Sequence, residues 1–200
     1  LPVEMMTEDM LNLKDSDGCT LAYNAAWHDS FPEWAKRNRD ILLLGNGQGN
    51  YVAHVLARRG KFPVESMTED ILKLKDASGC TVAYYAVWYK SFPEWAKRNK
   101  DILLLDDGQG NYVAHVLAQR GDLPIEMMRE DVLKLKTWDR CAVAYYAAWY
   151  DSFPEWAKRR KDILMLRSSC KDSVAHVLAR RGRLPVESMT PDILKLKGSD

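Results

Sequence analysis

The sequence lacks the features that define several large classes of protein. Its 200 residues carry a formal charge of only +1, from 29 Lys and Arg against 28 Asp and Glu. This balance argues against a polybasic nucleic-acid tail or an acidic solvating tail. No apolar run approaches the roughly 20 residues that span a bilayer, and no charged segment followed by an apolar one opens the chain as a secretory signal would. The four cysteines form no C-x-x-C pair, so we expect no zinc site.

What the chain does contain is a tandem repeat. A Leu-Pro or Phe-Pro dipeptide recurs every 61 residues, at positions 1, 62, 123 and 184, and a fixed period of this kind indicates a repeat architecture. We expect one repeat array over 1–200, with double units 1–61, 62–122 and 123–183 and a partial unit 184–200. An aspartate followed by an apolar pair recurs at alternating spacings of 31 and 30, namely at Asp9, Asp40, Asp70, Asp101, Asp131, Asp162 and Asp192. The basic module is therefore about half of each double unit.

Each module shows the signals of two helices. Thr68 followed by two acids predicts a helix start, and Pro191 after Thr190 repeats that signal with proline at the first helical position. A turn over 76–79 then precedes a second expected helix over 81–88. We also expect a capping box over 30–33, repeated at 91–94 and 152–155. No alternating strand is visible, and a module that cannot bury two helices alone must stack on its neighbours.

Two segments resemble the ankyrin repeat family. Residues 76–84 (Asp-Ala-Ser-Gly-Cys-Thr-Val-Ala-Tyr) resemble the run that closes the ankyrin hairpin and opens its first helix, and 49–60 resemble the same region, with His54, His115 and His176 in the family's histidine position. The resemblance covers about six modules and implies an all-α, right-stacked solenoid of helix-turn-helix repeats of ankyrin-like type. The sequence departs from the pattern where Val or Leu replaces the family proline, and where Arg140 and Lys171 interrupt the turn signature.

A second resemblance stays open. The run Thr190-Pro191-Asp192, together with the Gly-rich loop 46–49 and the helices around it, is similar to the DNA-reading repeats of transcription activator-like effectors. That resemblance implies a nucleic-acid-binding array, although the loop here is shorter and Val-Ala-His or Val-Ala-Tyr stands where that family differs.

The residues capable of chemistry have structural explanations. The three histidines lie two modules apart, too far to share a metal at ligand distances of about 2 Å, and the ankyrin resemblance implies that they bond the turn backbone. Cysteines in stacked modules are expected as free thiols, which suits a cytoplasmic or other reducing compartment, although a secreted effector stays open. Only Cys141 and Cys170, in neighbouring modules, could approach each other. We therefore expect no metal, no cofactor and no enzyme activity.

The strongest candidate binding positions are two residues at the end of each helix that follows a turn, which face the concave groove in ankyrin-like stacks. Aromatic and basic pairs alternate at these positions, and Trp, Tyr and Arg are enriched at binding hot spots. We call these twelve residues the helix-end surface: Trp27, His28, Arg58, Arg59, Trp88, Tyr89, Gln119, Arg120, Trp149, Tyr150, Arg180 and Arg181.

The same residues have a second explanation, because Trp of one module can stack on Arg of the next as a cation–π ladder. A further tryptophan in each double unit (Trp34, Trp95 and Trp156) is expected to pack between modules. Basic clusters at 36–39, 97–100 and 158–161 are expected to form a solvated face with intermodule ion pairs.

The sequence thus predicts a protein-interaction module that binds another protein or peptide, an acidic one included. Nucleic-acid binding and a purely structural spacer remain alternatives, and no membrane partner is expected. The modules lack capping repeats with polar outer faces, which solenoids normally need. We therefore expect more chain on either side, as the start at Leu1 also suggests, or a contact between molecules.

Overall fold

The computed structural model describes residues 5–89, 92–169 and 171–198. The chain separates into two compact units, the first made of Leu1–Ala96 and Leu105–Gly108 and the second of Lys97–Leu104 and Gln109–Asp200. The described residues form helices joined by long hairpins, and the only strand-like pairs among them are isolated bridges at the hairpin bases, such as Lys14 with Thr20. The predicted all-α class is therefore confirmed.

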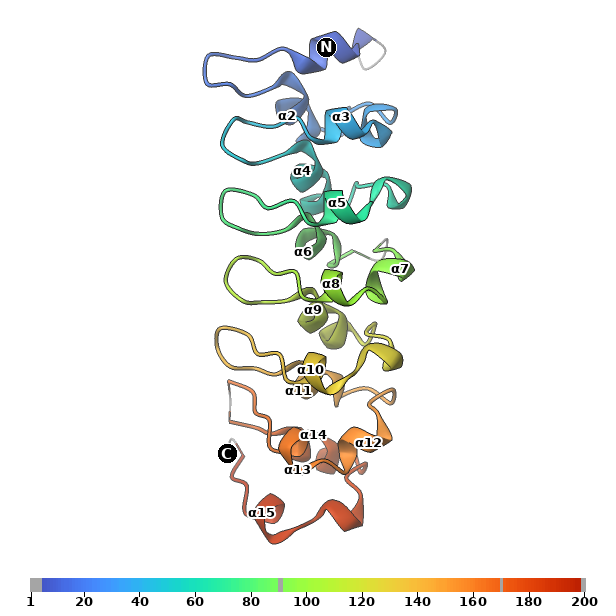
Figure 1. The fold of residues 1–200 in the computed structure, drawn as a ribbon, viewed down its shortest axis with the longest axis vertical. Helices are drawn as coiled ribbons and strands as arrows, with labels where there is room; N and C mark the ends of the chain where they lie inside the picture. Colours follow the sequence, from blue (N-terminus) through green and yellow to red (C-terminus); the bar gives the residue numbers. More distant parts are fainter. Residues whose placement is uncertain (1–4, 90–91, 170, 199–200) are drawn as a thin grey trace. The chain divides into compact units, whose positions relative to one another are not determined.

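The first unit repeats one motif, in which a hairpin is followed by a helix of five to seven residues and then by a shorter one. Its α-helices are α1 (Glu8–Asn12), α2 (Leu21–Ala26), α3 (Arg39–Leu42), α4 (Val52–Arg58), α5 (Glu69–Leu72) and α6 (Val82–Ala86), with 3-10 turns η2 (Ala35–Arg37) and η3 (Val64–Ser66). A further helix, α7 (Glu94–Lys97), ends at the first residue of the second unit. Figure 1 shows α2, α4 and α6 at successive levels, with their hairpins on one side.

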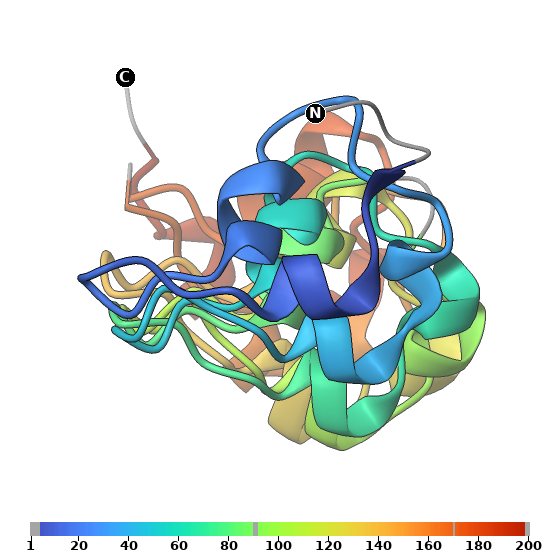
Figure 2. The ribbon, with the colours of Figure 1, turned by 90° about the horizontal axis from the view of Figure 1, so that it is seen from above.

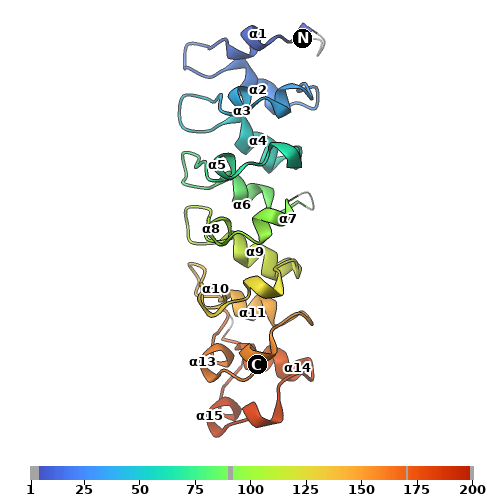
Figure 3. The same ribbon diagram turned by 45° about the vertical axis from the view of Figure 1, so that its right-hand side comes forward.

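The second unit repeats the same motif. Its elements are α8 (Lys100–Leu103), α9 (Val113–Arg120), η4 (Ile125–Met127), α10 (Glu130–Leu133), α11 (Val143–Ala147), α12 (Glu155–Lys158), α13 (Lys161–Leu164), α14 (Val174–Arg180), η5 (Val186–Ser188) and α15 (Pro191–Leu194). Within this unit α9, α11 and α14 lie at successive levels (Figure 3), and its hairpins gather on one side of the helices (Figure 2). The helix after each hairpin is called the first helix below, and a module is named type A or type B according to whether its first helix ends in the aromatic or the basic kind of pair.

The first helices are buried because their apolar residues face neighbouring modules. In α4, Val52 through Ala57 are all buried, and His54 is only 3% exposed. A seven-residue helix is marginal in isolation, so packing between modules must supply most of its stability. This confirms that stacking, rather than a single compact core, holds each unit together.

Side-chain caps differ from those the sequence predicts. Thr20 and Thr81 cap their helices by accepting from Tyr23 and Tyr84 backbone amides at 3.3 Å. The predicted capping box at Ser30 is wrong, because no helix begins there and Glu33 instead pairs with Lys36. The same prediction is wrong at Ser152, where Pro154 precedes α12 and no side chain caps it, and Ser91 lies outside the described residues.

The short helices begin at residues that the sequence signal missed. The Asn38 side chain accepts from the amides of Asp40 (2.9 Å) and Ile41 (3.3 Å), and Asn99 does the same for α8. Thr68 occupies the position before α5 but donates its hydroxyl to Asp70 instead of capping the helix. The predicted helix start at Thr68 is therefore correct, but the predicted side-chain cap is wrong.

The hairpin turns persist where their glycines are replaced. Gly18 and Gly79 adopt positive φ, and Arg140 takes the same conformation at the equivalent position, with φ of 67°. The turn bond is retained, since the Arg140 amide donates to Thr137 O at 2.9 Å. A non-glycine residue in this left-handed region costs about 1–2 kcal/mol. The hairpin therefore keeps its turn at Arg140, although the loss of the glycine from the sequence pattern suggests that the turn would be lost.

Replacing Arg140 with Gly should stabilise the second unit by about 0.5–1 kcal/mol, because the relief of left-handed strain exceeds the entropy cost of glycine. Urea unfolding measures the difference. The control is Trp138→Gly, two residues away at a position without positive φ, where only the entropy cost applies and stability should fall. A stability loss with Arg140→Gly would contradict the assignment of strain.

Candidate functional site

The recurring histidines join hairpin to helix and module to module. His54 Nδ1 accepts the Tyr51 amide at 3.2 Å, so Nε2 carries the proton and donates to Leu74 O at 3.1 Å in the next module. His115 and His176 make the same pair of contacts, with Leu135 O and Leu196 O. The predicted structural role of the histidines is confirmed, and both ring nitrogens of His54 are occupied by it.

The cysteines, the other side chains capable of chemistry, also lack the surroundings of a reactive site. The described cysteines, Cys19, Cys80 and Cys141, are free thiols, and burial raises the pKa of the Cys80 thiol to about 11. Such a thiol stays protonated and unreactive at neutral pH. Cys170 lies outside the described residues, so its expected approach to Cys141 stays a prediction. Within the described ranges no cluster of three or more His, Cys, Asp or Glu is arranged to hold a metal ion.

The first residue of each pair on the helix-end surface is exposed. Trp27 (42%) and Trp88 (48%) in the first unit, and Trp149 (38%) in the second, follow the last turn of α2, α6 and α11. In the first unit each ring makes an edge-to-face contact with a tyrosine of its own helix, with Tyr23 6.5 Å from Trp27 and Tyr84 6.4 Å from Trp88 between ring centroids. These two rings are thus held on one side by their own helix and remain partly exposed to solvent.

Arg58 lies between two aromatic rings of the first unit. Its guanidinium carbon is 5.7 Å from the Trp27 ring centroid and 5.2 Å from that of Tyr85, within the range of cation–π attraction. The predicted ladder therefore exists here, although its second rung is Tyr85 rather than a tryptophan. Tyr85 is not among the residues predicted from the sequence, and its position one turn before Trp88 is the signal that identifies it.

The second residue of each pair binds the neighbouring module. In the first unit Tyr89 donates its hydroxyl to Arg58 O at 2.6 Å, and Arg59 donates to Ala26 O at 3.0 Å and pairs with Asp29. In the second unit Tyr150 donates to Gln119 O at 2.5 Å. These residues are largely committed to stacking. His28 is exposed and makes no equivalent contact within the described residues of its unit.

In the second unit the basic members of the pairs meet carboxylates. Arg180 lies 2.6 Å from the nearly buried carboxylate of Asp172, and Arg120 lies 3.0 Å from Asp122. Arg181 lies 3.8 Å from the exposed Asp151. Gln119 is exposed where the other type B modules have arginine. The cationic character of the helix-end surface is therefore partly neutralised from within.

The basic clusters form the intermodule ion pairs that were expected. Arg37 pairs with Glu65 and Arg98 with Glu126, both at 2.9 Å. Arg159–Glu187 repeats this spacing, a second spacing recurs in the pairs Arg39–Asp70, Lys100–Asp131 and Lys161–Asp192, and Arg160 reaches back to Glu130. Because these side chains are exposed, each pair contributes little to stability. A nucleic acid would have to compete with these carboxylates for the same cations.

The second set of tryptophans is less buried than expected. Trp34, Trp95 and Trp156 each expose 42–43% of their surface, so packing between modules covers only part of each ring. They lie in or beside η2, α7 and α12, not at the ends of the first helices. Equal exposure at a different location makes them suitable controls for Trp88 and Trp149. None of the described helices has the length and apolar character that crossing a bilayer requires.

A double-mutant cycle on Arg58 and Tyr85 tests the ladder. Arg58→Met and Tyr85→Leu should show a coupling of about 0.5–1 kcal/mol in the free energy of unfolding, because each loses the other's cation–π contact. In the second unit the equivalent residues are Gln119 and Tyr146, and their cycle should give a coupling near zero. Equal coupling in both cycles would mean that the charge of Arg58 contributes nothing.

The buried imidazole of His54 makes stability depend on pH. Desolvation lowers its pKa below the ordinary value of 6.5, so below 6.5 the unfolded chain binds the proton more readily than the folded one. The free energy of unfolding should therefore rise with pH up to 6.5 and lose that dependence above it. An NMR titration of the ring checks the pKa, and His54→Gln should flatten the pH dependence. A pKa at or above 6.5 would contradict this account.

Comparison with solved structures identifies the fold. An ankyrin repeat domain from Acinetobacter baumannii AYE superposes with a TM-score of 0.51 at 13% identity, covering 83% of this chain and 93% of that one. A chain from the complex of the predatory endopeptidase Bd0816 of Bdellovibrio bacteriovorus with immunity protein Bd3460 superposes with a TM-score of 0.52 at 14% identity, covering 92% and 100%. No protein-family model and no curated protein sequence matches the chain. The similarity is one of fold.

Proposed function

Because the fold is an ankyrin-like repeat stack, we propose that this chain is a protein-interaction module that binds a protein or peptide through its helix-end surface. The observation that carries the proposal is the partial exposure of the tryptophans at the ends of α2 and α6 in the first unit and of α11 in the second, with Arg58 stacked on Trp27. An exposed large aromatic ring whose edge is fixed by its own helix loses little conformational freedom on binding. Such rings are typical anchors of interfaces.

The contacts divide the helix-end surface into two parts. Trp27, Trp88 and Trp149 are the proposed anchors because they are 38–48% exposed, with one face of Trp27 already covered by Arg58 of the next module. Tyr89, Tyr150 and Arg59 bind neighbouring modules and therefore position the anchors. Arg58 stacks on Trp27. The other basic positions of the helix-end surface keep part of their positive charge beside carboxylates, which favours a partner that brings apolar side chains together with acidic ones.

The comparisons support a binding role only through the fold. One of the similar chains comes from a complex between an endopeptidase and an immunity protein, which is an assembly of two proteins. Ankyrin-like stacks present repeated surface positions on a fixed scaffold, and varied positions on such a scaffold suit recognition.

The anchors can be tested with a peptide selected from a random displayed library against the whole chain. Trp88→Ala and Trp149→Ala should each weaken its binding by about tenfold or more, the cost typical of a hot-spot residue. Trp95→Ala and Trp156→Ala, equally exposed elsewhere, should leave the dissociation constant unchanged. Isothermal titration calorimetry gives the constants, and circular dichroism checks that each variant folds.

Binding that survives both helix-end substitutions but is lost with the control substitutions would place the site on the other tryptophan row. Titration of a labelled DNA duplex separates the nucleic-acid alternative. That alternative predicts an affinity that falls steeply as salt rises and weakens with substitutions at 158–161. Tight, salt-sensitive DNA binding together with failure to select any peptide would overturn the proposal.

A further inference from the structure

The second unit contains a hollow between two hairpins in which positive charge collects. The two hairpins precede α11 and α14 and lie on the same side of the unit (Figure 1). The hollow has a volume of about 360 Å³, which is within the range of small-ligand sites. We call it the hairpin hollow. Four basic side chains line it, namely Lys136, Arg140, Arg167 and Lys171, and we call these four residues the hairpin cations.

The hairpin cations have no ion-pair partner among the residues that the structure describes, whereas the basic cluster at 158–161 pairs with carboxylates. The one carboxylate in the lining belongs to Asp139. The Thr137 hydroxyl donates to it and lowers the pKa of that carboxyl, so it is ionised at neutral pH. The next carboxylate along the chain, that of Asp172, pairs with Arg180. Four cations and one carboxylate leave three uncompensated positive charges in the lining.

This charge arises where the third double unit departs from the first two. Three of the hairpin cations replace a residue that is neutral or acidic in both earlier double units. The replaced residues are Gly18 and Gly79 at the position of Arg140, Gly45 and Asp106 at that of Arg167, and Gly49 and Gly110 at that of Lys171. Arg140 and Lys171 keep the left-handed conformation of those glycines, with φ of 67° and 69°, although it is unfavourable for a residue with a side chain. Strained backbone of this kind clusters at ligand-binding sites.

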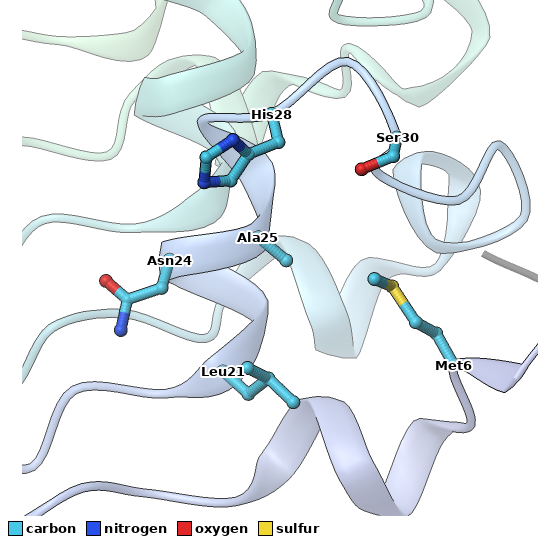
Figure 4. Close-up of a pocket in the computed structure, with 6 residues that line it drawn as sticks. All are labelled: Met6, Leu21, Asn24, Ala25, His28 and Ser30. Atoms are coloured by element: carbon cyan, nitrogen blue, oxygen red, sulfur yellow. The ribbon is translucent and has the colours of Figure 1, made fainter. Parts of the chain in front are cut away.

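The first unit contains the equivalent hollow without the charge. Its hairpins 14–20 and 43–51 line a hollow of about 280 Å³, in whose lining Lys14 is the one charged residue. A larger hollow of that unit, shown in Figure 4, has a volume of about 380 Å³. Its lining contains no lysine or arginine and consists of Met6, Leu21, Asn24, Ala25, His28 and Ser30. The shape of the hairpins alone therefore does not produce a cationic hollow, and the replaced residues do.

We propose that the hairpin hollow binds a small anion that carries two linked phosphoryl groups. The guanidinium groups of Arg140 and Arg167 can bind phosphoryl oxygens in pairs, while lysine contributes a point charge. One phosphoryl group carries about −1.5 to −2 charge at neutral pH, so two of them match three uncompensated positive charges better than one does. The replacements are confined to two hairpins, which favours a compact anion over the long row of phosphates in a nucleic acid.

Isothermal titration calorimetry of the whole chain with pyrophosphate tests the proposal. We expect saturable binding of one pyrophosphate per chain, and weaker binding of inorganic phosphate. Arg167→Gln should weaken pyrophosphate binding by about tenfold or more, because it removes charge-assisted hydrogen bonds from the hollow. Arg159→Gln removes the same charge from an exposed ion pair of the same unit and should leave the dissociation constant unchanged.

Arg140→Gly gives a result that a loss of folding cannot imitate. The substitution restores the residue of the other double units and should raise stability, because it relieves the left-handed strain. It should also weaken pyrophosphate binding by about tenfold, because a guanidinium is lost from the hollow. A variant that is more stable in urea and binds less tightly thus separates ligand binding from a purely structural role.

The first unit allows a gain-of-binding test. The double variant Gly18→Arg/Gly49→Lys places two cations beside Lys14 in the equivalent hollow. The positions have room, because nothing lies within 4 Å of a Cβ at Gly18 and the nearest atom to a Cβ at Gly49 is 3.8 Å away. Gly45 stays unchanged, because a Cβ there would collide with Asn50 O. Circular dichroism checks the fold, and the stoichiometry should rise from one pyrophosphate per chain to two.

Four results would overturn the proposal. The first is pyrophosphate binding weaker than about 1 mM. The second is equal weakening by Arg167→Gln and Arg159→Gln, which would indicate diffuse attraction to surface charge. The third is a stoichiometry of one in the folded Gly18→Arg/Gly49→Lys variant. The fourth is a labelled DNA duplex that binds through Arg167 and is not displaced by pyrophosphate.

The site is independent of the proposed tryptophan anchors, because no residue of the helix-end surface lines the hairpin hollow. Trp88→Ala and Trp149→Ala should therefore leave pyrophosphate binding unchanged, and Arg167→Gln should leave the binding of the selected peptide unchanged. The two proposals can thus fail separately.

Discussion

The structure depends on one constraint, which is that the short first helix of a module is stable only when neighbouring modules cover its apolar residues. A helix of five to eight residues has too few internal hydrogen bonds to persist alone. Burial of residues such as Val52 and Leu56 between layers supplies what the helix itself does not. The hairpins serve the same end, since Thr20 and Thr81 bond to the hairpin that follows, at Gly45 O and Asp106 O.

This constraint assigns the polar side chains their roles. Histidine joins layers on the hairpin side through Leu74 O, and tyrosine joins them at the opposite end of the first helix through Arg58 O. Side chains used in this way are not available to a ligand. The first residue of each helix-end pair, Trp88 among them, stays exposed. The proposed binding of a partner thus uses side chains that stacking leaves uncovered.

The sequence predicts the repeated helices and hairpins of this fold. It does not predict which side chain caps a given helix or which side chains meet across modules. The period and the hairpin signature of 76–84 were enough for the fold class, and the spacing of the histidines excluded a shared metal. The Ser30 capping box failed because the chain enters η2 through Pro32 and Trp34, while Asn38 caps the next helix. The contact between Arg58 and Tyr85 could not be predicted for the same reason, because residues 27 positions apart in the sequence come together only when the modules stack.

The central claim is that the tryptophans at the helix ends are the anchors for a partner. The chain has seven tryptophans, and each gives one indole N–H signal when tryptophan alone carries ¹⁵N. A titration with a bound peptide, followed by NMR, therefore reports on both rows of rings in one experiment. The account predicts that the signals of Trp27, Trp88 or Trp149 shift while those of Trp34, Trp95 and Trp156 stay in place. Shifts confined to Trp34, Trp95 and Trp156 would contradict it.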